Sequence, residues 1–496
     1  MKLREFLEHH GIAGNPVAEE DAQNDTVFKR TCLETTFHPS WDKIFGDSAD
    51  PSTAIVFGEK GAGKTALKLQ MVRQIERENE SVAESGGSAM PVGKTLVVLY
   101  DDFNPFLDRF VSRVGPNRPV EKVLGQWKLW DHMDAILSLA VTQLVSLLVG
   151  ANTRCKWSLA SAEARDLTLL AACYDQSTAE SFPSRFARLR RRIGYGRLVD
   201  RWPLGLGVLA TAIMATAISI GVWRGGLDFT TWWWPWMLVA VSWAPWLVRQ
   251  ARGRLVAWRI VRSMRTGNRS LGQLASALAS MPPVDLAGQP LPASARSDDR
   301  YELLAKFQGI LGRLGCLGMV VIVDRLDEPH LINGSAERMR QAIWPIFDNK
   351  FLKSPGLGLK LLLPAELFGF IERETEAFHQ RARLDKQNLV PSLEWSGETL
   401  YDIASMRVRA ASVVNPPTTL SQLFEPQVDQ RRLLEGLRSL RVPRHLFKFL
   451  YRLLVAHCHA HTEEAPVYRI PLERFETVLA VYRRDQEAFD RGLAPR

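Results

Sequence analysis

The chain has 496 residues, of which 46% are hydrophobic and 24% are charged. This balance is typical of a globular protein with one large or roughly two to three ordinary domains, and it excludes a disordered chain. The five cysteines are scattered and form no CxxC pair, which excludes a disulfide scaffold and a zinc ribbon and favours a reducing compartment. The first residues hold no apolar run, so we expect no cleaved secretory signal.

The net charge of +9 is concentrated in two blocks. Residues 185–201 carry seven arginines and one acid, and residues 249–269 carry seven arginines and no acid. These blocks sum to +13, so the remaining residues carry a net charge of −4. Arginine blocks of this kind occur in nucleic-acid-binding proteins and beside membrane spans, and the residues between them decide which interpretation is favoured.

A glycine-rich motif follows the first predicted strand. Residues 54–57 are a short apolar run, and residues 58–65 then read GEKGAGKT, which matches GxxxxGK[ST]. The glycines let backbone N–H groups turn toward phosphate oxygens, Lys64 supplies a positive charge for the β- and γ-phosphates, and the Thr65 hydroxyl is a hard ligand for Mg²⁺. A helix from Ala66 to about Glu78 would point its N-terminus at the anion. The expected nucleotide-binding residues are Gly58, Glu59, Lys60, Gly61, Ala62, Gly63, Lys64 and Thr65.

Two further elements are expected before the arginine blocks. Residues 95–100 are typical of a second strand, and residues 121–150 are typical of one long helix whose apolar periodicity indicates packing rather than function.

A glycine-rich turn with a coincidental lysine remains the alternative to nucleotide binding at residues 58–65.

The residues between the arginine blocks predict a membrane hairpin. Residues 203–223 contain no charge, residues 232–248 contain none either, and only residues 224–231 connect them. A spanning helix needs about 20 apolar residues, so the first span is long enough and the second is slightly short. Because both outer flanks are arginine-rich, both ends are expected in the cytoplasm. A buried hairpin in a soluble core and nucleic-acid binding by the arginines remain the alternatives.

An acidic strand end follows the hairpin and a linker. Residues 319–323 are apolar and are followed by DRLDE. A P-loop protein needs an acid at such a strand end to hold Mg²⁺, and Asp324 is the expected ligand, directly or through water. Asp327 and Glu328 lie one turn further on, and either could orient the attacking water, with Glu328 favoured. The alternative is that these two acids only cap a helix start.

Two classes of P-loop protein are excluded by their missing motifs. A GTPase would show DxxG after the acidic strand and NKxD later, whereas here Asp324 is followed by RLD, and Asn349 and Lys350 by FL. An ABC ATPase would carry an LSGGQ-like sequence, which is absent. ATP with Mg²⁺ is therefore the expected cofactor.

The order of these motifs resembles the KAP family of P-loop NTPases, in the AAA+/STAND division. The resemblance covers about residues 50–460 and includes VVIVDRLDEPH at residues 320–330, LKLLLPAEL at residues 359–367, residues 384–408 at the start of the helical lid, and RVPRHLFKFL at residues 441–450. It implies a sensor strand at residues 359–367, a sensor arginine at Arg444 and an arginine finger at Arg381 or Arg383; the alternative for each arginine is an ordinary surface residue. The family often has a second acid where this chain has Arg325, which puts the base and efficient hydrolysis in doubt.

The expected fold is therefore α/β: a P-loop NTPase with a parallel sheet, a two-helix transmembrane hairpin inserted between the Walker A and Walker B motifs, and a C-terminal helical lid. The expected segments are residues 1–50 near the adenine site, 51–184 and 301–395 as the two halves of the NTPase domain, 185–270 as the hairpin with its flanks, 271–300 as a linker and 396–496 as the lid.

The expected function is a membrane-anchored, ATP-hydrolysing switch in signalling or defence. The KAP resemblance implies an anti-phage role, because that family includes phage-exclusion proteins. The chain is expected in the inner membrane with both termini in the cytoplasm; the sequence leaves a homo-oligomer and a protein partner open and gives no reason to expect nucleic acid. The alternatives are a soluble DNA-acting ATPase and a scaffold that binds ATP but hydrolyses it poorly. The cluster His457, Cys458, His459 and His461 is expected to be structural, because these positions do not share one helix face.

Overall fold

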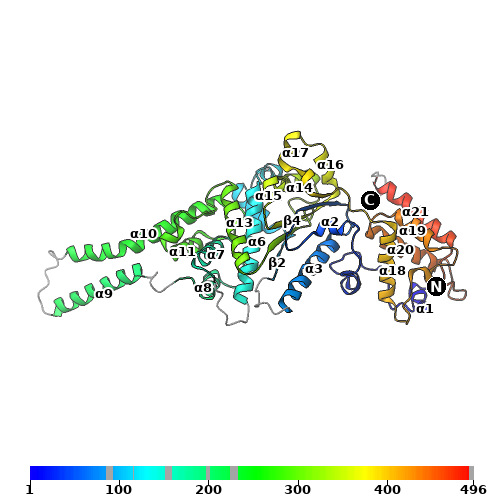
Figure 1. The fold of residues 1–496 in the computed structure, drawn as a ribbon, viewed down its shortest axis with the longest axis horizontal. Helices are drawn as coiled ribbons and strands as arrows, with labels where there is room; N and C mark the ends of the chain where they lie inside the picture. Colours follow the sequence, from blue (N-terminus) through cyan, green and yellow to red (C-terminus); the bar gives the residue numbers. More distant parts are fainter. Residues whose placement is uncertain (85–92, 116, 151–158, 197–201, 224–232, 491–496) are drawn as a thin grey trace. The chain divides into compact units, whose positions relative to one another are not determined.

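The computed structural model describes residues 1–84, 93–115, 117–150, 159–196, 202–223 and 233–490. These residues form an α/β fold with a sheet of five parallel strands in the order β2-β3-β4-β1-β5 (Figure 1). The strands are β1 (Ala54–Gly58), β2 (Thr95–Tyr100), β3 (Gly318–Val323), β4 (Leu357–Pro364) and β5 (Asn388–Val390). The α/β class and the parallel sheet expected from the sequence are confirmed.

Tertiary contacts divide the chain into two compact units. The first unit consists of Met1–Ser85, Val320–Arg340 and Phe347–Arg496. The second unit consists of Gly86–Met319 and Gln341–Ile346. Segments that are far apart in the sequence therefore belong to the same unit, and the glycine-rich motif shares a unit with the residues that follow β3.

The strand before the glycine-rich motif lies between two strands of the first unit. β1 pairs with β4 from Ala54 opposite Lys360 to Gly58 opposite Pro364, and its other edge pairs with β5. Every residue of β1 and β4 is buried, which explains why both sequences are continuous apolar runs rather than alternating ones. Because parallel strands end at one edge of the sheet, the residues that follow β1 and β4 emerge side by side.

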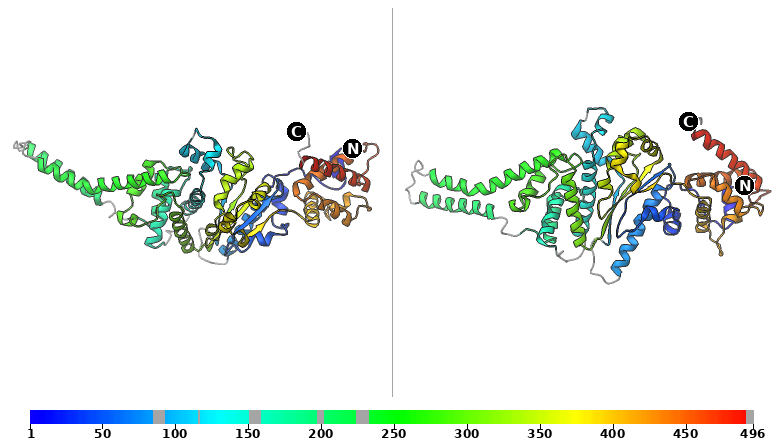
Figure 2. Two further views of the ribbon diagram at one scale, coloured as in Figure 1. Left: turned by 90° about the horizontal axis from the view of Figure 1, so that it is seen from above. Right: turned by 45° about the horizontal axis from the view of Figure 1, so that its top comes forward.

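Helices make up the C-terminal part of the first unit. They are α18 (Gly397–Ala411), α19 (Gln430–Arg438), α20 (Pro443–His459) and α21 (Leu472–Asp490). The N-terminal helix α1 (Leu3–His9) contributes Phe6 and Leu7 to the core of these helices, and Figures 1 and 2 show the N-terminus among them. The first residues of the chain are therefore part of the helical region.

The second unit is mainly helical. Its helices are α4 (Asn104–Val114), α5 (Val120–Leu124), α6 (Leu129–Gly150), α7 (Ser161–Tyr174), α8 (Phe182–Arg192), α9 (Trp202–Trp223), α10 (Trp233–Ser263), α11 (Leu271–Ala279), α12 (Pro283–Leu286) and α13 (Asp298–Arg313). The single helix expected over residues 121–150 is wrong, because α5 ends before Gly125 and α6 begins four residues later. The range 271–300 is not only a linker, since Leu274 and Leu278 are buried on α11.

Helices α9 and α10 lie side by side as an antiparallel pair (Figures 1 and 2). Trp243 Nε1 on α10 donates a hydrogen bond to Thr211 Oγ1 on α9 over 3.0 Å. Helix α10 continues past the expected end of the second span at Val248, so much of the second arginine block is helical. The loop expected at residues 224–231 lies outside the described residues.

Two helices among the described residues are long and apolar enough to cross a membrane. The stretch Leu129–Gly150 is 67% buried within the protein, which agrees with the packing role expected for it, whereas Trp202–Ile220 is only 11% buried. The large apolar side chains exposed on α9 and α10 include Leu204, Leu206, Val208, Leu209, Ile213, Ile220, Trp236, Met237, Leu238, Val241, Leu247 and Val248. Large apolar side chains are therefore exposed on both helices, while only the α9 stretch of this pair is among the two candidate spans found in the described residues.

The remaining elements are the 21-residue helix α3 and a set of shorter ones. They are η1 (Phe28–Cys32, a π-helix), α2 (Trp41–Phe45), α3 (Lys64–Glu84), α14 (Ala336–Ile343), η3 (Trp344–Ile346), α15 (Asn349–Leu352), η4 (Ala365–Leu367), α16 (Phe368–Glu372), α17 (Glu376–Ala382), η5 (Leu384–Lys386) and η6 (Leu420–Leu423).

Candidate nucleotide-binding site

The glycine-rich loop connects β1 to α3. Gly61 and Gly63 have φ angles of 92° and 95°, which side chains other than glycine rarely adopt. A Cβ atom on Gly61 would also collide with the side chain of Arg444. Because α3 begins at Lys64, its first N–H groups and the positive end of its dipole lie at this loop, which is the arrangement that binds phosphate in other proteins.

The side chain of Lys64 folds back over its own loop. Its Nζ donates hydrogen bonds to the carbonyl oxygens of Gly58 at 2.6 Å and of Glu59 at 3.0 Å. An ammonium held by two neutral carbonyls can exchange them for phosphate oxygens, with which its hydrogen bonds are stronger.

Burial lowers the pKa of the Lys64 ammonium below its usual value. Three carboxylates oppose this shift, and in decreasing order of effect they belong to Asp327, Asp324 and Glu366. Arg444 lowers the pKa of Lys64 slightly further. Lys64 is therefore a partly desolvated cation surrounded by three acids and a second cation.

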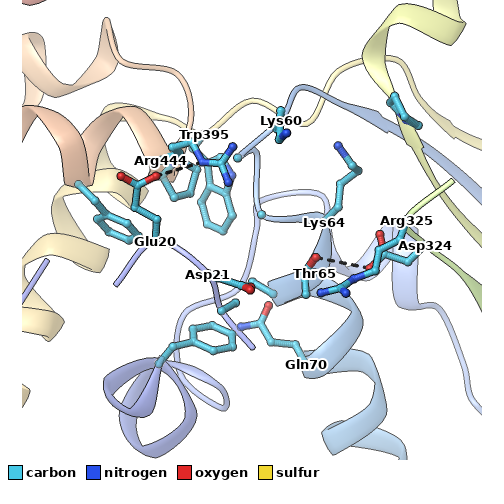
Figure 3. A pocket seen from close by; sticks show the side chains of 18 of the residues that line it. Glu20, Asp21, Lys60, Lys64, Thr65, Gln70, Asp324, Arg325, Trp395 and Arg444 are labelled. Atoms are coloured by element: carbon cyan, nitrogen blue, oxygen red, sulfur yellow. Dashed lines mark hydrogen bonds and ion pairs between the residues drawn. The ribbon is translucent and has the colours of Figure 1, made fainter. Parts of the chain in front are cut away.

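Thr65 and Asp324 meet although 259 positions separate them in the sequence (Figure 3). Thr65 Oγ1 lies 3.4 Å from Asp324 Oδ2, within the range of a long hydrogen bond. Asp324 directly follows β3 and is only 2% exposed. The structure thus brings together the two residues that the sequence predicted as Mg²⁺ ligands.

These two side chains present the donor chemistry that Mg²⁺ prefers. A hydroxyl and a carboxylate are hard oxygen ligands, and Mg²⁺ in nucleotide sites usually takes one or two protein ligands and completes its shell with phosphate and water. The described residues contain no group of three or more His, Cys, Asp or Glu side chains arranged for a metal. The residues present therefore fit a metal brought in with a nucleotide and not a separate protein-only metal site.

The two acids after Asp324 differ in their surroundings. Glu328 is more than half exposed, and its Oε2 lies 3.4 Å from Arg325 Nη1. Asp327 has the largest of the carboxylate effects on the Lys64 ammonium. Both predicted bases line the cavity; Asp327 has the stronger electrostatic effect on Lys64, and Glu328, the one that the sequence favoured, is paired with Arg325.

Arg325 occupies the position at which the resembled family often has an acid. Its φ of 57° is left-handed, and its guanidinium also donates to the side chain of Gln23 from the N-terminal segment. Its side chain is thus directed by two partners, Gln23 and Glu328.

Sequence reasoning missed Glu366 as a site residue. This acid lies two positions after β4, the strand between those that precede the loop and Asp324 in the sheet order. It lines the same cavity as Lys64 and raises the pKa of Lys64. A signal was present in the sequence, because an acid shortly after a buried apolar strand resembles the pattern that identified Asp324.

The helical region reaches the loop through Arg444 and Trp395. The backbone N–H of Arg444 donates to Gly61 O over 3.3 Å, and Trp395 Nε1 donates to Ala62 O over 2.8 Å. The Arg444 guanidinium lies 3.4 Å from Glu20 of the N-terminal segment. Figure 3 shows Arg444 and Glu20 on one side of Lys64 and Asp324 on the other.

The two predicted arginine-finger positions do not line this cavity. Arg381 stacks over the ring of Phe378 at 5.7 Å, and Arg383 pairs with Asp385 at 3.5 Å. Arg383 has a left-handed φ of 47° at the end of α17. A role toward a second subunit stays a prediction.

A cavity of about 460 Å³ lies above the loop. Its polar wall contains the loop lysines, Asp324, Asp327, Glu328, Glu366 and Arg444. The N-terminal segment and the lid also line it, with Glu20, Asp21 and Arg407 beside the apolar Ala22, Phe28, Ile403, Trp395 and Phe447. Residues of the N-terminal segment therefore line the cavity, and their place near an adenine base stays a prediction.

Of the cluster at residues 457–461, His457 and Cys458 are packed within the helical core, whereas His459 is exposed. His457 is fully buried, contacts the rings of Phe6 and His461, and donates a hydrogen bond from Nε2 to Val467 O over 2.8 Å. Desolvation lowers the pKa of His457. These contacts agree with the structural role expected for it.

Comparisons of the chain with protein-family models, with curated proteins and with solved structures find no match.

Proposed function

We propose that this chain is a membrane-anchored P-loop NTPase that binds and hydrolyses ATP with Mg²⁺. The observation that carries the proposal is the distance of 3.4 Å between Thr65 Oγ1 and Asp324 Oδ2, beside a lysine-bearing loop and at the wall of a cavity of about 460 Å³. This combination supports a site for a triphosphate with a divalent cation, because each residue type has a distinct task there.

The chain's own groups divide the work of hydrolysis. The loop amides and the N-terminus of α3 bind the phosphates, and Lys64 moves its hydrogen bonds from Gly58 and Glu59 to phosphate oxygens. Thr65 and Asp324 would hold Mg²⁺, which would supply positive charge to neutralise the transferred phosphoryl group. Asp327 accepts a proton from the attacking water and keeps it oriented, and Glu366 adds a further negative charge that opposes the lowered pKa of Lys64. Arg444 exchanges Glu20 for the γ-phosphate and closes the lid.

The hairpin supplies the membrane anchor in this proposal. The exposed apolar side chains of α9 and α10 favour insertion, and the arginines that follow on α10 favour a cytoplasmic position for both outer ends. A role as a signalling or defence switch in the inner membrane rests on the resemblance to KAP-type ATPases alone. Retention in the membrane fraction after a carbonate wash would support the anchor; a soluble chain whose DNA affinity falls steeply with salt would support the DNA-acting alternative.

A scaffold that binds ATP but hydrolyses it poorly is the second candidate. Arg325 favours it, because this residue stands where an acid is common and draws Glu328 toward itself. The scaffold would be supported if the unmodified chain binds ATP without turnover and the Arg325→Glu variant gains turnover. Turnover in the unmodified chain that Asp327→Asn abolishes would support the ATPase.

The direct test is ATP affinity of the full chain in detergent for Lys64→Ala. Loss of a charged hydrogen-bonding partner is expected to weaken binding by about 100-fold. The control is Lys43→Ala, which removes an exposed lysine whose Nζ donates to Leu389 O at 2.8 Å and which does not line the cavity. Equal affinities for the unmodified chain and Lys64→Ala would refute the site.

A further inference from the structure

A second lysine of α3 contacts the predicted metal-binding aspartate. Lys68 lies four residues after Lys64, and its Nζ is 3.2 Å from Asp324 Oδ2. The side chains of both residues are only 2% exposed. The same oxygen, Asp324 Oδ2, also faces the Thr65 hydroxyl at 3.4 Å.

This contact places a fixed positive charge at the position that a metal ion needs. A buried ammonium is costly to desolvate, and an ion pair offsets that cost only while the partners stay together. Because the Lys68 side chain is only 2% exposed, its charge is held next to Asp324 and away from solvent. A cation binding at Asp324 therefore meets Lys68 as well as Lys64 as a neighbouring positive charge.

We propose that Lys68 is a positioning residue that takes over part of the electrostatic task of Mg²⁺ at Asp324. It neutralises Asp324, so ATP binds with little help from Mg²⁺, and it competes with Mg²⁺, so the divalent cation binds weakly. The proposal rests on the proposed function and specifies how that site is regulated: the Mg²⁺ concentration controls turnover and leaves nucleotide occupancy nearly unchanged.

The first test uses the unmodified full chain in detergent. Its affinity for ATP is measured with saturating Mg²⁺ and again with EDTA. We expect the two dissociation constants to agree within about fivefold, because Lys68 already compensates Asp324. A larger gain with Mg²⁺ overturns the proposal. A chain that binds no ATP in either buffer contradicts the proposed function instead, so the two failures are distinguishable.

The second test is Lys68→Gln, with Mn²⁺ as the probe in place of Mg²⁺. Free Mn²⁺ is measured by electron paramagnetic resonance at saturating ATP, and removal of the competing charge is expected to tighten Mn²⁺ binding by about tenfold. The control is Arg77→Gln, which removes one positive charge from the same helix at a half-exposed position paired with Glu34. Lys68→Arg keeps the charge and is expected to keep the weak Mn²⁺ affinity. A folded Lys68→Gln chain with unchanged Mn²⁺ affinity overturns the proposal, and if this variant does not fold, the buffer comparison on the unmodified chain decides.

Discussion

Two buried carboxylates, one in each unit, differ in what surrounds them. Asp324 in the first unit lines a cavity and faces Lys68 and the Thr65 hydroxyl. Asp134 in the second unit is surrounded by donors: Arg300 binds both of its oxygens at 3.1 Å, and the Tyr174 hydroxyl donates to Oδ1 at 2.8 Å. Both side chains are buried, but Asp324 lines the cavity of about 460 Å³, whereas Asp134 is bound by Arg300 and Tyr174. The comparison separates a candidate site from a structural ion pair.

A second ion pair of the helical unit anchors the base of the hairpin. Arg265, two residues after the end of α10, binds both carboxylate oxygens of Asp131. Arg113 donates to the carbonyl oxygens of Val261, Met264 and Gly267 at the end of the same helix. These hydrogen bonds supply donors to carbonyl oxygens at and after the end of the helix, so the role of Arg113 is structural.

The largest effect is expected for Arg300→Met. This variant leaves the carboxylate of Asp134 buried without its main partner, and loss of one member of a buried pair costs about 3–5 kcal/mol. The free energy of unfolding should fall by that amount in denaturant titrations followed by tryptophan fluorescence. ATP affinity of the folded fraction should be unchanged; a loss of ATP binding in folded protein would break the distinction between the two carboxylates.

The opposite pattern is expected for Asp324→Asn. The amide keeps the shape of the side chain but loses the charge that holds the metal, and ATP turnover should fall by about 100-fold. Steady-state phosphate release measures this loss. Asp385→Asn is the matched control, because its carboxylate is exposed and pairs with Arg383 outside the cavity. Equal turnover in Asp324→Asn and the unmodified chain would remove Asp324 from the mechanism.

The pH dependence of the free energy of unfolding should reveal the contribution of His132, a buried residue of the second unit. Burial lowers the pKa of His132 to about 4, so this histidine stays neutral in the folded protein while it takes up a proton in the unfolded chain below its usual pKa. Its contribution to stability is therefore complete above about pH 6.5 and is lost as the pH falls toward 4. Between pH 7 and 5 the loss amounts to roughly 2 kcal/mol.

The measurement compares denaturant midpoints of the unmodified chain and His132→Gln at pH 7 and 5. The His132→Gln variant cannot take up this proton and should not lose that free energy of unfolding. The amount by which the unmodified chain is more stable than the variant should therefore be smaller at pH 5 than at pH 7. Desolvation raises the pKa of the neighbouring Asp131 to about 6, and that shift acts with the opposite sign, because the folded state then binds the proton first as the pH falls. A pH-independent difference between the two proteins would contradict the role given to His132.

The smallest effect is expected inside the hairpin. Trp243→Phe removes the Nε1 donor to Thr211 Oγ1, and hydrogen bonds between membrane helices contribute about 0.6 kcal/mol on average. A double-mutant cycle with Thr211→Ala in detergent unfolding experiments measures the coupling. A coupling energy above about 2 kcal/mol would show that this hydrogen bond stabilises the hairpin as strongly as a buried ion pair such as Arg300–Asp134 stabilises the second unit.

Local patterns predicted the parts of the site that lie close in sequence. The strands at residues 54–57, 95–100 and 319–323 were predicted within one residue at each end, because continuous apolar runs bounded by glycine or charge are strong local signals. The glycine-rich loop between β1 and α3 was predicted from its GxxxxGK[ST] spacing, and its binding of phosphate stays a prediction. The sheet order was not predicted, since it depends on pairings between segments separated by hundreds of residues.

The contacts that refine the site are also non-local. Lys68 was unremarkable on a helical pattern, and its contact with Asp324 joins residues separated by 256 positions in the sequence. Glu20 and Arg444 come from opposite ends of the chain. The range 271–300 was predicted as a linker, yet apolar positions of α11 are buried. That burial depends on tertiary contacts, which composition alone does not specify.

A structure of the full chain in detergent with Mg²⁺ and a non-hydrolysable ATP analogue tests the central claim most directly. The account predicts the triphosphate within residues 58–65, Lys64 turned from its carbonyls to the phosphates, and Mg²⁺ between Thr65 and Asp324. A nucleotide bound elsewhere, or a loop that stays vacant at saturating analogue, would contradict it.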